Sequence, residues 1–207
     1  GWGSIREKIV YGELDAAHSL YSMIYAIQLG ISGAPATDMA VLMGLNQNGQ
    51  SINLSQRLKS AGITSANALE HRARQPGDKL NFAQTFPTGT HAMWLYYWLA
   101  TQGIHPLWDV NSVVVPWCAN AVAQGQGFTV ATSQSIWPDH PEKVLACTRE
   151  FVEQYPNTAR ALVMSVLEAS RFIEASQENR RSTAQFLSSS DYLDVPLANI
   201  EPRFMGD

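Results

Sequence analysis

The chain has 207 residues, of which 45% are hydrophobic and 15% charged, with a formal net charge of −4. This is the composition of a compact globular chain that can bury a full core in one or two domains, and it excludes a disordered class. The acidic balance argues against nucleic acid or an acidic membrane as a direct partner, and no apolar run approaches the length of a membrane span. The two cysteines, Cys118 and Cys147, can pair or stay free, so they define no redox compartment.

The first part of the chain alternates helical and strand patterns. In chain order, the predicted elements are a helix at 4–10, a strand at 14–17, a helix at 20–27, and strands at 39–45 and 51–54. Ser4 and Glu7 have the capping-box spacing for the first helix. The continuous apolar run 39–45 predicts a strand buried on both faces. A polar stretch at 60–78 then separates this part from the next.

A strand-to-helix junction at 85–94 is the most distinctive stretch of the sequence. Residues 80–84 alternate apolar and polar, as a half-buried strand does, and the run 93–99 is apolar nearly all round, as in a buried helix. The junction between them predicts a helix N-terminus with unpaired N–H groups.

Three residues give this junction its chemistry. Thr88 or Thr90 can serve as the N-cap, and Gly89 lets the backbone approach a neighbour closely. That geometry suits an anion, while an ordinary capped turn has the same pattern. His91, in the first helical turn, favours the anion only slightly.

Strands at 112–115 and 127–131 precede a helical last third. Asp139, followed by a proline and a glutamate, predicts a helix that runs to about 155. Lys143 then lies in a first turn, where a cation opposes the helix dipole and needs a negative partner, either Glu142 or a bound anion. The alternation of strands and helices predicts an α/β fold with mostly parallel sheets, two lobes and a ligand cleft between them.

The motifs of common enzymes are missing from the sequence. There is no G-x-S-x-G elbow, Walker A loop, H-E-x-x-H or C-x-x-C, and the five histidines are scattered. No enzyme activity, metal site or cofactor is therefore expected. Neutral donors and one cation remain, and this is binding chemistry.

Five motifs in fixed order resemble the NrtA/CmpA/NasS family of nitrate- and bicarbonate-binding proteins. They are GWGS at 1–4, GELDAAH at 12–18, LNQNGQ at 45–50, FPTGTH at 86–91 and WPDHPEK at 137–143. The resemblance covers nearly the whole chain and implies a two-lobed fold like that of type II periplasmic binding proteins, which closes on an oxyanion.

The same resemblance implies how the lobes divide. Lobe 1 is expected to be discontinuous, at 1–55 plus 136–207, with lobe 2 at 56–135. The family pattern has further segments ahead of Trp2, beyond Asp207 and between Pro116 and Trp117. We therefore expect these segments to be missing and Pro116 and Trp117 not to be covalently adjacent.

By the same resemblance, the ligand contacts fall on six positions: Trp2, Gln50, Gly89, Thr90, His91 and Lys143. Nitrate is a planar, weakly accepting monoanion, so modest N–H donors, one full positive charge and an aromatic wall suit it. Bicarbonate-binding members differ at the lysine position, so Lys143 favours nitrate or nitrite over bicarbonate. Each residue also has an ordinary structural explanation, such as Trp2 in a core or Lys143 on a surface.

Two roles follow from ligand capture. The sequence favours a NasS-type cytoplasmic sensor, which holds an RNA-binding antiterminator protein (NasT-like) until nitrate or nitrite releases it. The alternative is the periplasmic receptor of a nitrate ABC importer, with the transporter's membrane subunits as partners. The importer role needs an export signal ahead of Trp2, so these residues leave the compartment open.

Overall fold

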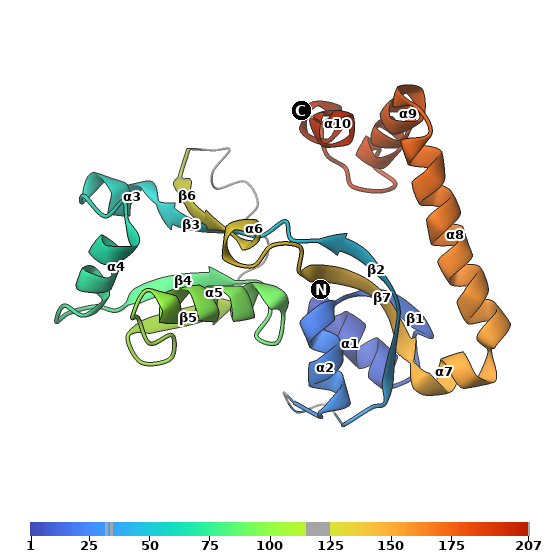
Figure 1. Ribbon diagram of the computed structural model, residues 1–207, viewed down its shortest axis with the longest axis horizontal. Coiled ribbons are helices and arrows are strands. Elements are labelled where there is room, and N and C mark those ends of the chain that lie inside the picture. Colours follow the sequence, from blue (N-terminus) through green and yellow to red (C-terminus); the bar gives the residue numbers. More distant parts are fainter. Residues whose placement is uncertain (32, 34, 115–124, 207) are drawn as a thin grey trace. The chain divides into compact units, whose positions relative to one another are not determined.

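The computed structural model describes residues 1–31, 33, 35–114 and 125–206 (Figure 1). The chain divides into two compact units, Gly1–Glu153 and Gln154–Asp207. The Pro116–Trp117 junction and Cys118 lie outside the described residues. Within the described residues, none of the helices combines the length and the apolar character that a membrane crossing requires.

The first unit is a mixture of short helices and strands. Its elements are α1 (Trp2–Val10), β1 (Ala16–Leu20), α2 (Tyr21–Gln28), β2 (Met39–Gln47), β3 (Ser51–Ser55), α3 (Gln56–Ser60), α4 (Ala66–Ala73), β4 (Leu80–Gln84), α5 (Thr90–Thr101), β5 (Val110–Val114), β6 (Gly127–Thr132), α6 (Ser133–Ile136), β7 (Pro141–Thr148) and, up to the boundary, α7 (Arg149–Gln154). This confirms the predicted mixed α/β composition.

Three small sheets organise these elements. One has the order β1-β7-β2 with antiparallel pairs, β3 pairs with β6 antiparallel, and β4 pairs with β5 parallel. The prediction of mostly parallel sheets is therefore wrong for the described strands. The reason is that β2 continues into β3 through the short connection 48–50, and β6 returns to β7 through α6, so the outgoing and returning strands run in opposite directions.

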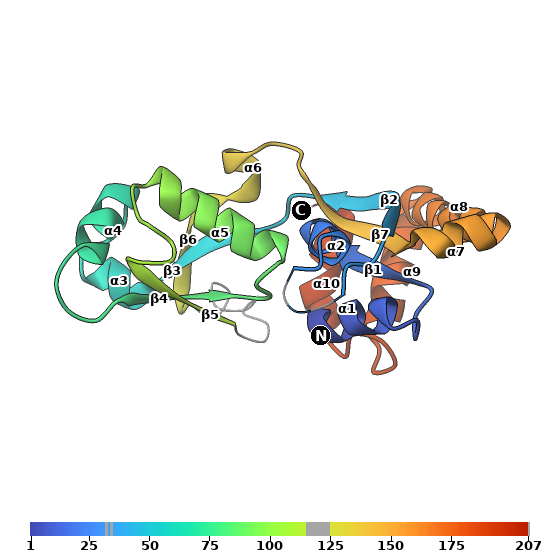
Figure 2. The same cartoon turned by 90° about the horizontal axis from the view of Figure 1, so that it is seen from below.

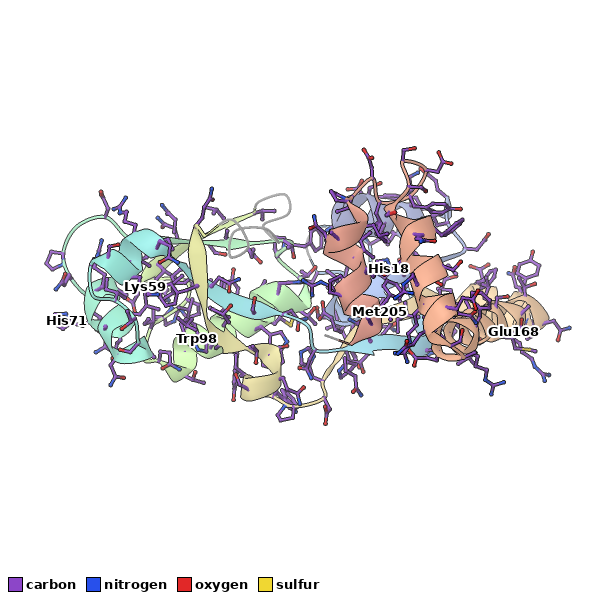
Figure 3. All side chains as sticks on the ribbon, turned by 90° about the horizontal axis from the view of Figure 1, so that it is seen from above. His18, Lys59, His71, Trp98, Glu168 and Met205 are labelled. Atoms are coloured by element: carbon purple, nitrogen blue, oxygen red, sulfur yellow. The ribbon has the colours of Figure 1, made fainter. Side chains whose placement is uncertain are left out.

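Two separate hydrophobic cores lie in the first unit. The first joins α1, α2 and the β1-β7-β2 sheet, and its buried residues are Ile9, Leu20, Met23, Ile24, Ile27, Met39, Val144 and Ala146. The second joins α5 to the β3–β6 and β4–β5 pairs (Figure 2), and its buried residues are Ile52, Leu54, Ile63, Leu69, Phe82, Leu95, Trp98, Leu99, Ile104 and Val110. Trp98, labelled in Figure 3, is the largest side chain of this core.

The helix predicted from Asp139 to about 155 is wrong. Residues Pro141–Thr148 form β7, which pairs with β1 on one side and β2 on the other, and the helix α7 begins only at Arg149. The apolar run 144–147 is buried as the centre of the sheet, and this burial outweighs the local capping signal. Lys143 is consequently a strand residue, so it does not oppose the dipole of a helix of its own.

Two smaller predictions also differ from the structure. Gly1, and not Ser4, is the N-cap of α1, and β2 is buried mainly at Met39 instead of on both faces. The predicted strands at 51–54 and 80–84 and the helix after 90 are confirmed by β3, β4 and α5.

The second unit is helical, as predicted. It consists of α8 (Pro156–Glu174), α9 (Gln177–Ser188) and α10 (Leu197–Met205). Proline at the start of α8 needs no N–H there, and an ion pair of 2.9 Å between Arg181 and Glu201 joins α9 to α10.

Candidate functional site

The first turn of α5 presents unpaired polar groups. Gly89 is the N-cap and supplies no side-chain cap, so the prediction of a threonine cap is wrong. By helix geometry, the N–H groups of Thr90 and His91 have no acceptor within α5. The buried hydroxyls of Thr88 and Thr90 also lack a hydrogen-bond partner among the described residues.

Gly89 is required because α5 begins close to another element. A Cβ at this position would lie 2.8 Å from Leu20 Cδ1, so that the leucine would have to move, and 3.2 Å from the Phe86 carbonyl oxygen, which is a tight contact with backbone. The preceding turn is fixed by Ser22 of α2, whose Oγ donates a buried hydrogen bond of 2.9 Å to the Thr88 carbonyl. The predicted close approach at Gly89 is thus present, and it joins α5 to β1 and α2.

Lys143 and Glu142 form an ion pair on β7. Asn46 pairs with Lys143 and the next β2 residue, Gln47, pairs with Pro141, so Glu142 is the extra residue of a β-bulge. A bulge interrupts the alternation of a strand. Here it allows neighbouring side chains to meet, and Lys143 Nζ contacts Glu142 Oε1. The neighbour that the sequence offered as the partner of Lys143 is therefore its partner in the structure.

Glu142 is the most deeply buried charged residue of this cluster, with 1% of its surface exposed. Besides Lys143, its Oε1 lies 3.8 Å from His91 Nδ1. Its Oε2 has no hydrogen-bond partner among the described residues. The carboxylate thereby connects the strand β7 to the first turn of α5.

His91 is partly buried against this carboxylate. Burial lowers the pKa of His91 below its ordinary value of 6.5; the negative charge of Glu142 opposes that change and the positive charge of Lys143 adds to it. Its Nδ1 is buried without a hydrogen-bond partner in the described part of the chain. The neutral imidazole is therefore the favoured form before any ligand binds.

Trp2 forms an aromatic wall beside the lysine. Its ring centroid lies 5.7 Å from Lys143 Nζ, within the range of a cation–π contact, and 5.1 Å from the ring centroid of His18 (Figure 3 labels His18, on β1). Burial, and then the charge of Lys143, lower the pKa of His18. Trp2 therefore belongs to the site as well as to the core around α1.

Gln50 lies in the connection between β2 and β3. Its backbone exchanges hydrogen bonds with Ser133, and 9% of its surface is exposed. Both side-chain amide atoms are buried without a partner among the described residues. Since buried polar groups are normally paired, the unpaired atoms of Gln50, like the hydroxyls of Thr88 and Thr90, are candidates for ligand contacts.

Of the six predicted site residues, the structure brings five together. Lys143 and His91 both lie next to Glu142, Trp2 lies next to Lys143, and Gly89 and Thr90 precede His91 in the chain. Gln50 is buried as expected, but no side-chain hydrogen bond ties it to the other five in the part of the chain that the structure describes. Glu142 was not predicted as a site residue. Its position before Lys143 in the WPDHPEK motif was the available signal.

The cluster is suited to binding an anion. It combines one ammonium group, an imidazole, amide and hydroxyl donors, and a helix N-terminus. No group of three or more histidine, cysteine or carboxylate side chains capable of holding a metal occurs among the described residues. Anion capture is the chemistry these groups have in common.

The chain is similar to proteins of nitrate transport. It is 34% identical over 233 residues to the nitrate/nitrite binding protein NrtA of Synechocystis sp. PCC 6803, covering 99% of this chain and 52% of that protein. It is 29% identical to the nitrate import ATP-binding protein NrtC of the same organism, over 99% of this chain and 34% of that protein. The chain thus spans about half, or less, of the length of these relatives.

A solved structure extends this likeness to the fold. The crystal structure of the periplasmic nitrate-binding protein NrtA from Synechocystis PCC 6803 matches with a TM-score of 0.85 and 34% identity, over 100% of this chain and 60% of that one. This confirms the predicted periplasmic-binding-protein-like fold class. Residues 1–120 and 113–188 match the NMT1-like family. The chain therefore belongs to the NMT1-like family.

Proposed function

We propose that this chain binds nitrate or nitrite as part of the receptor of a nitrate ABC importer. Its similarity to NrtA supports nitrate or nitrite as the ligand, and its similarity to NrtC supports a role in nitrate import. The structural observation that carries the proposal is the set of buried polar atoms without partners at the start of α5, beside Lys143. A bound oxyanion gives these atoms the hydrogen bonds they lack.

In the proposed complex, each of the six predicted residues has a role. Lys143 supplies the full positive charge, and Gln50 and His91 donate hydrogen bonds. The backbone at Gly89 and Thr90 adds the partial positive charge of a helix N-terminus. Trp2 bounds one side of the planar ion. A dense cage of arginines is unnecessary for so weak an acceptor.

We also propose that the two cores of the first unit belong to the two lobes of the fold. The core around α5 lies within 56–135 apart from its β3 residues, and the core around α1 and β7 lies within 1–55 plus 136–207. The ligand groups come from both sides: His91 from the first turn of α5, and Lys143 from β7. An anion between them favours lobe closure, because it gains contacts from both lobes only when they are close.

The receptor role has more support than the sensor role that the sequence favoured. The relatives described above are a binding protein and an ATP-binding protein of nitrate import, and the solved relative is periplasmic. We therefore propose a periplasmic location and the membrane subunits of an ABC transporter as partners. The NasS-type sensor, with its RNA-binding antiterminator partner, gains nothing from these comparisons.

Calorimetric titration tests the proposed ligand. Nitrate and nitrite are expected to bind with saturation, and bicarbonate to bind more weakly because Lys143 occupies the position that differs in bicarbonate-binding relatives. Lys143→Ala is expected to abolish binding and His91→Ala to weaken it. Lys59→Ala and His71→Ala, on α3 and α4 (Figure 3), are matched controls outside the site. Unchanged affinity in both site variants would refute this assignment.

The proposed role has a separate test. Nitrate-loaded protein is expected to stimulate ATP hydrolysis by the reconstituted nitrate importer, while Lys143→Ala protein does not. Retention of an antiterminator protein in the absence of nitrate, and its release by nitrate, would support the sensor role instead.

A further inference from the structure

A carboxylate inside a proposed anion site is an unexpected group, because like charges repel each other. Glu142 Oε1 contacts Lys143 Nζ and lies 3.8 Å from His91 Nδ1. Its side chain is 2% exposed, so water screens this charge poorly. The carboxylate therefore takes part in the charge balance of the site.

Before an anion binds, the charges of this site cancel. Lys143 and Glu142 carry opposite charges and form an ion pair, and His91 is neutral there. A bound monoanion adds one negative charge. Lys143 and Glu142 do not compensate it, because their own charges already cancel. An uncompensated charge in a buried site is costly, and a protonated imidazole at His91 removes that cost.

We propose that anion binding at this site is proton-linked: His91 takes up one proton from solvent as a monoanion binds, and Glu142 is the residue that makes this proton necessary. The inference rests on the proposed function. It adds a specificity-determining residue and a pH response to that function. Protonated His91 donates from both ring nitrogens, so it can serve Glu142 through Nδ1 and the anion through Nε2.

The direction of the linkage follows from the charges. In the empty protein, burial holds the pKa of His91 below its ordinary value. A bound anion adds negative charge and raises that pKa. Between the two pKa values, binding takes up as much as one proton, and the affinity falls by up to about tenfold for each unit of rising pH. Outside that window the affinity is independent of pH, and it is highest on the acidic side.

In the described part of the chain, other charged and titratable groups of the site and its surroundings lie on β7, β1 and α1 and in the turn before β7. Glu142 and Lys143 face it from β7. The ring of His18 on β1 packs at a tilt against Trp2, which lies beside Lys143. On α1, the Arg6 guanidinium lies 5.6 Å from the centroid of the Phe86 ring, in the turn before α5.

Two other histidines around the site, His18 and His140, are the alternatives to His91 as the source of a pH effect. The ring of His140 packs at a tilt against Trp94 of α5, with ring centroids 4.4 Å apart, and His18 is the histidine beside Lys143. Both are included in the test below.

Proton uptake can be counted directly by calorimetry. Nitrate is titrated into the full chain near neutral pH in two cationic buffers of different protonation enthalpy, which do not compete for the site. The difference between the binding heats in the two buffers is expected to correspond to the uptake of more than zero and at most one proton. Equal heats with intact nitrate binding would overturn this inference and leave the proposed function standing. Absence of nitrate binding would remove both.

Variants identify the proton acceptor and its cause. His91→Asn is expected to bind nitrate without proton uptake, whereas His18→Asn, His140→Asn and the distant control His71→Asn keep the uptake. Glu142→Gln removes the competing charge, so it should lose the uptake and bind nitrate more tightly than the wild type above neutral pH. Weaker binding with unchanged uptake in Glu142→Gln would mean that Glu142 only braces Lys143, and the inference would fail.

Discussion

Ser22 Oγ donates a hydrogen bond of 2.9 Å to the backbone carbonyl of Thr88, 66 residues further along the chain. This buried bond connects α2, in one hydrophobic core, to the turn that opens α5, at the edge of the other. The position of the anion-binding turn therefore depends on a residue that has no proposed contact with the ligand.

We predict that Ser22→Ala lowers the free energy of unfolding by about 1–3 kcal/mol, because it leaves a buried carbonyl without its donor. Nitrate affinity should fall as well, since the turn is less well fixed. Urea unfolding and calorimetry measure the two effects. Ser165→Ala is the matched control, because Ser165 Oγ bonds an exposed carbonyl within its own helix and its loss should cost little.

Gly89→Ala is expected to destabilise the protein by about 1–3 kcal/mol through overpacking. The added Cβ meets Leu20 Cδ1 at 2.8 Å, so the second substitution Leu20→Ala should recover part of the loss at α5 while adding a cavity of its own. A thermodynamic cycle from urea unfolding measures this coupling. Gly44→Ala is the control, because a Cβ there meets nothing within 4 Å. Additive effects of the two substitutions would contradict the proposed clash.

Lys143→Met should cost stability as well as binding. It leaves the buried Glu142 without its cation, at a cost of about 1–3 kcal/mol or more. The double variant Glu142→Gln with Lys143→Met removes both charges, so thermal unfolding should show recovered stability while calorimetry shows no nitrate binding. Recovery of binding in the double variant would mean that the ammonium group is not the source of affinity.

The empty protein is expected to lose stability as the pH falls through the histidine range. The pKa values of His91 and His18 are lowered in the folded state, so the folded protein binds fewer protons than the unfolded chain. Their contribution is fully present above the ordinary value near 6.5 and is lost progressively below it. Urea unfolding across this range should show the decline, and saturating nitrate should reduce it. A decline that is unaffected by substitution of both histidines by Asn would assign it to other groups.

Local patterns predicted much of the fold. The alternation in Leu80–Gln84 and the apolar run that follows Gly89 identified β4 and α5, because each pattern has the period of its element. β7 was mistaken for a helix, since Asp139 and the following proline form a local start signal. The burial of 144–147 between two other strands is a tertiary effect, which no local pattern contains.

The candidate site, like the fold, was predicted from the sequence only in part. The motif positions supplied Trp2, Gln50, His91 and Lys143 through a family resemblance. The sequence offered Glu142 only as a partner of Lys143, because its approach to His91 depends on how β7 passes the start of α5. The Ser22–Thr88 bond was equally inaccessible, since no spacing rule joins residues 66 positions apart.

The β-bulge at Glu142 makes the site sensitive to the register of β7. In a regular strand, neighbouring residues point to opposite faces, so the Glu142 and Lys143 side chains meet only because one extra residue interrupts the pairing with β2. A shift of one residue in the register of β7 against β2 would therefore change the direction of the ammonium group. The pairing register of β7, as well as the identity of the charged residues, thus decides how the ammonium group is presented in the proposed site.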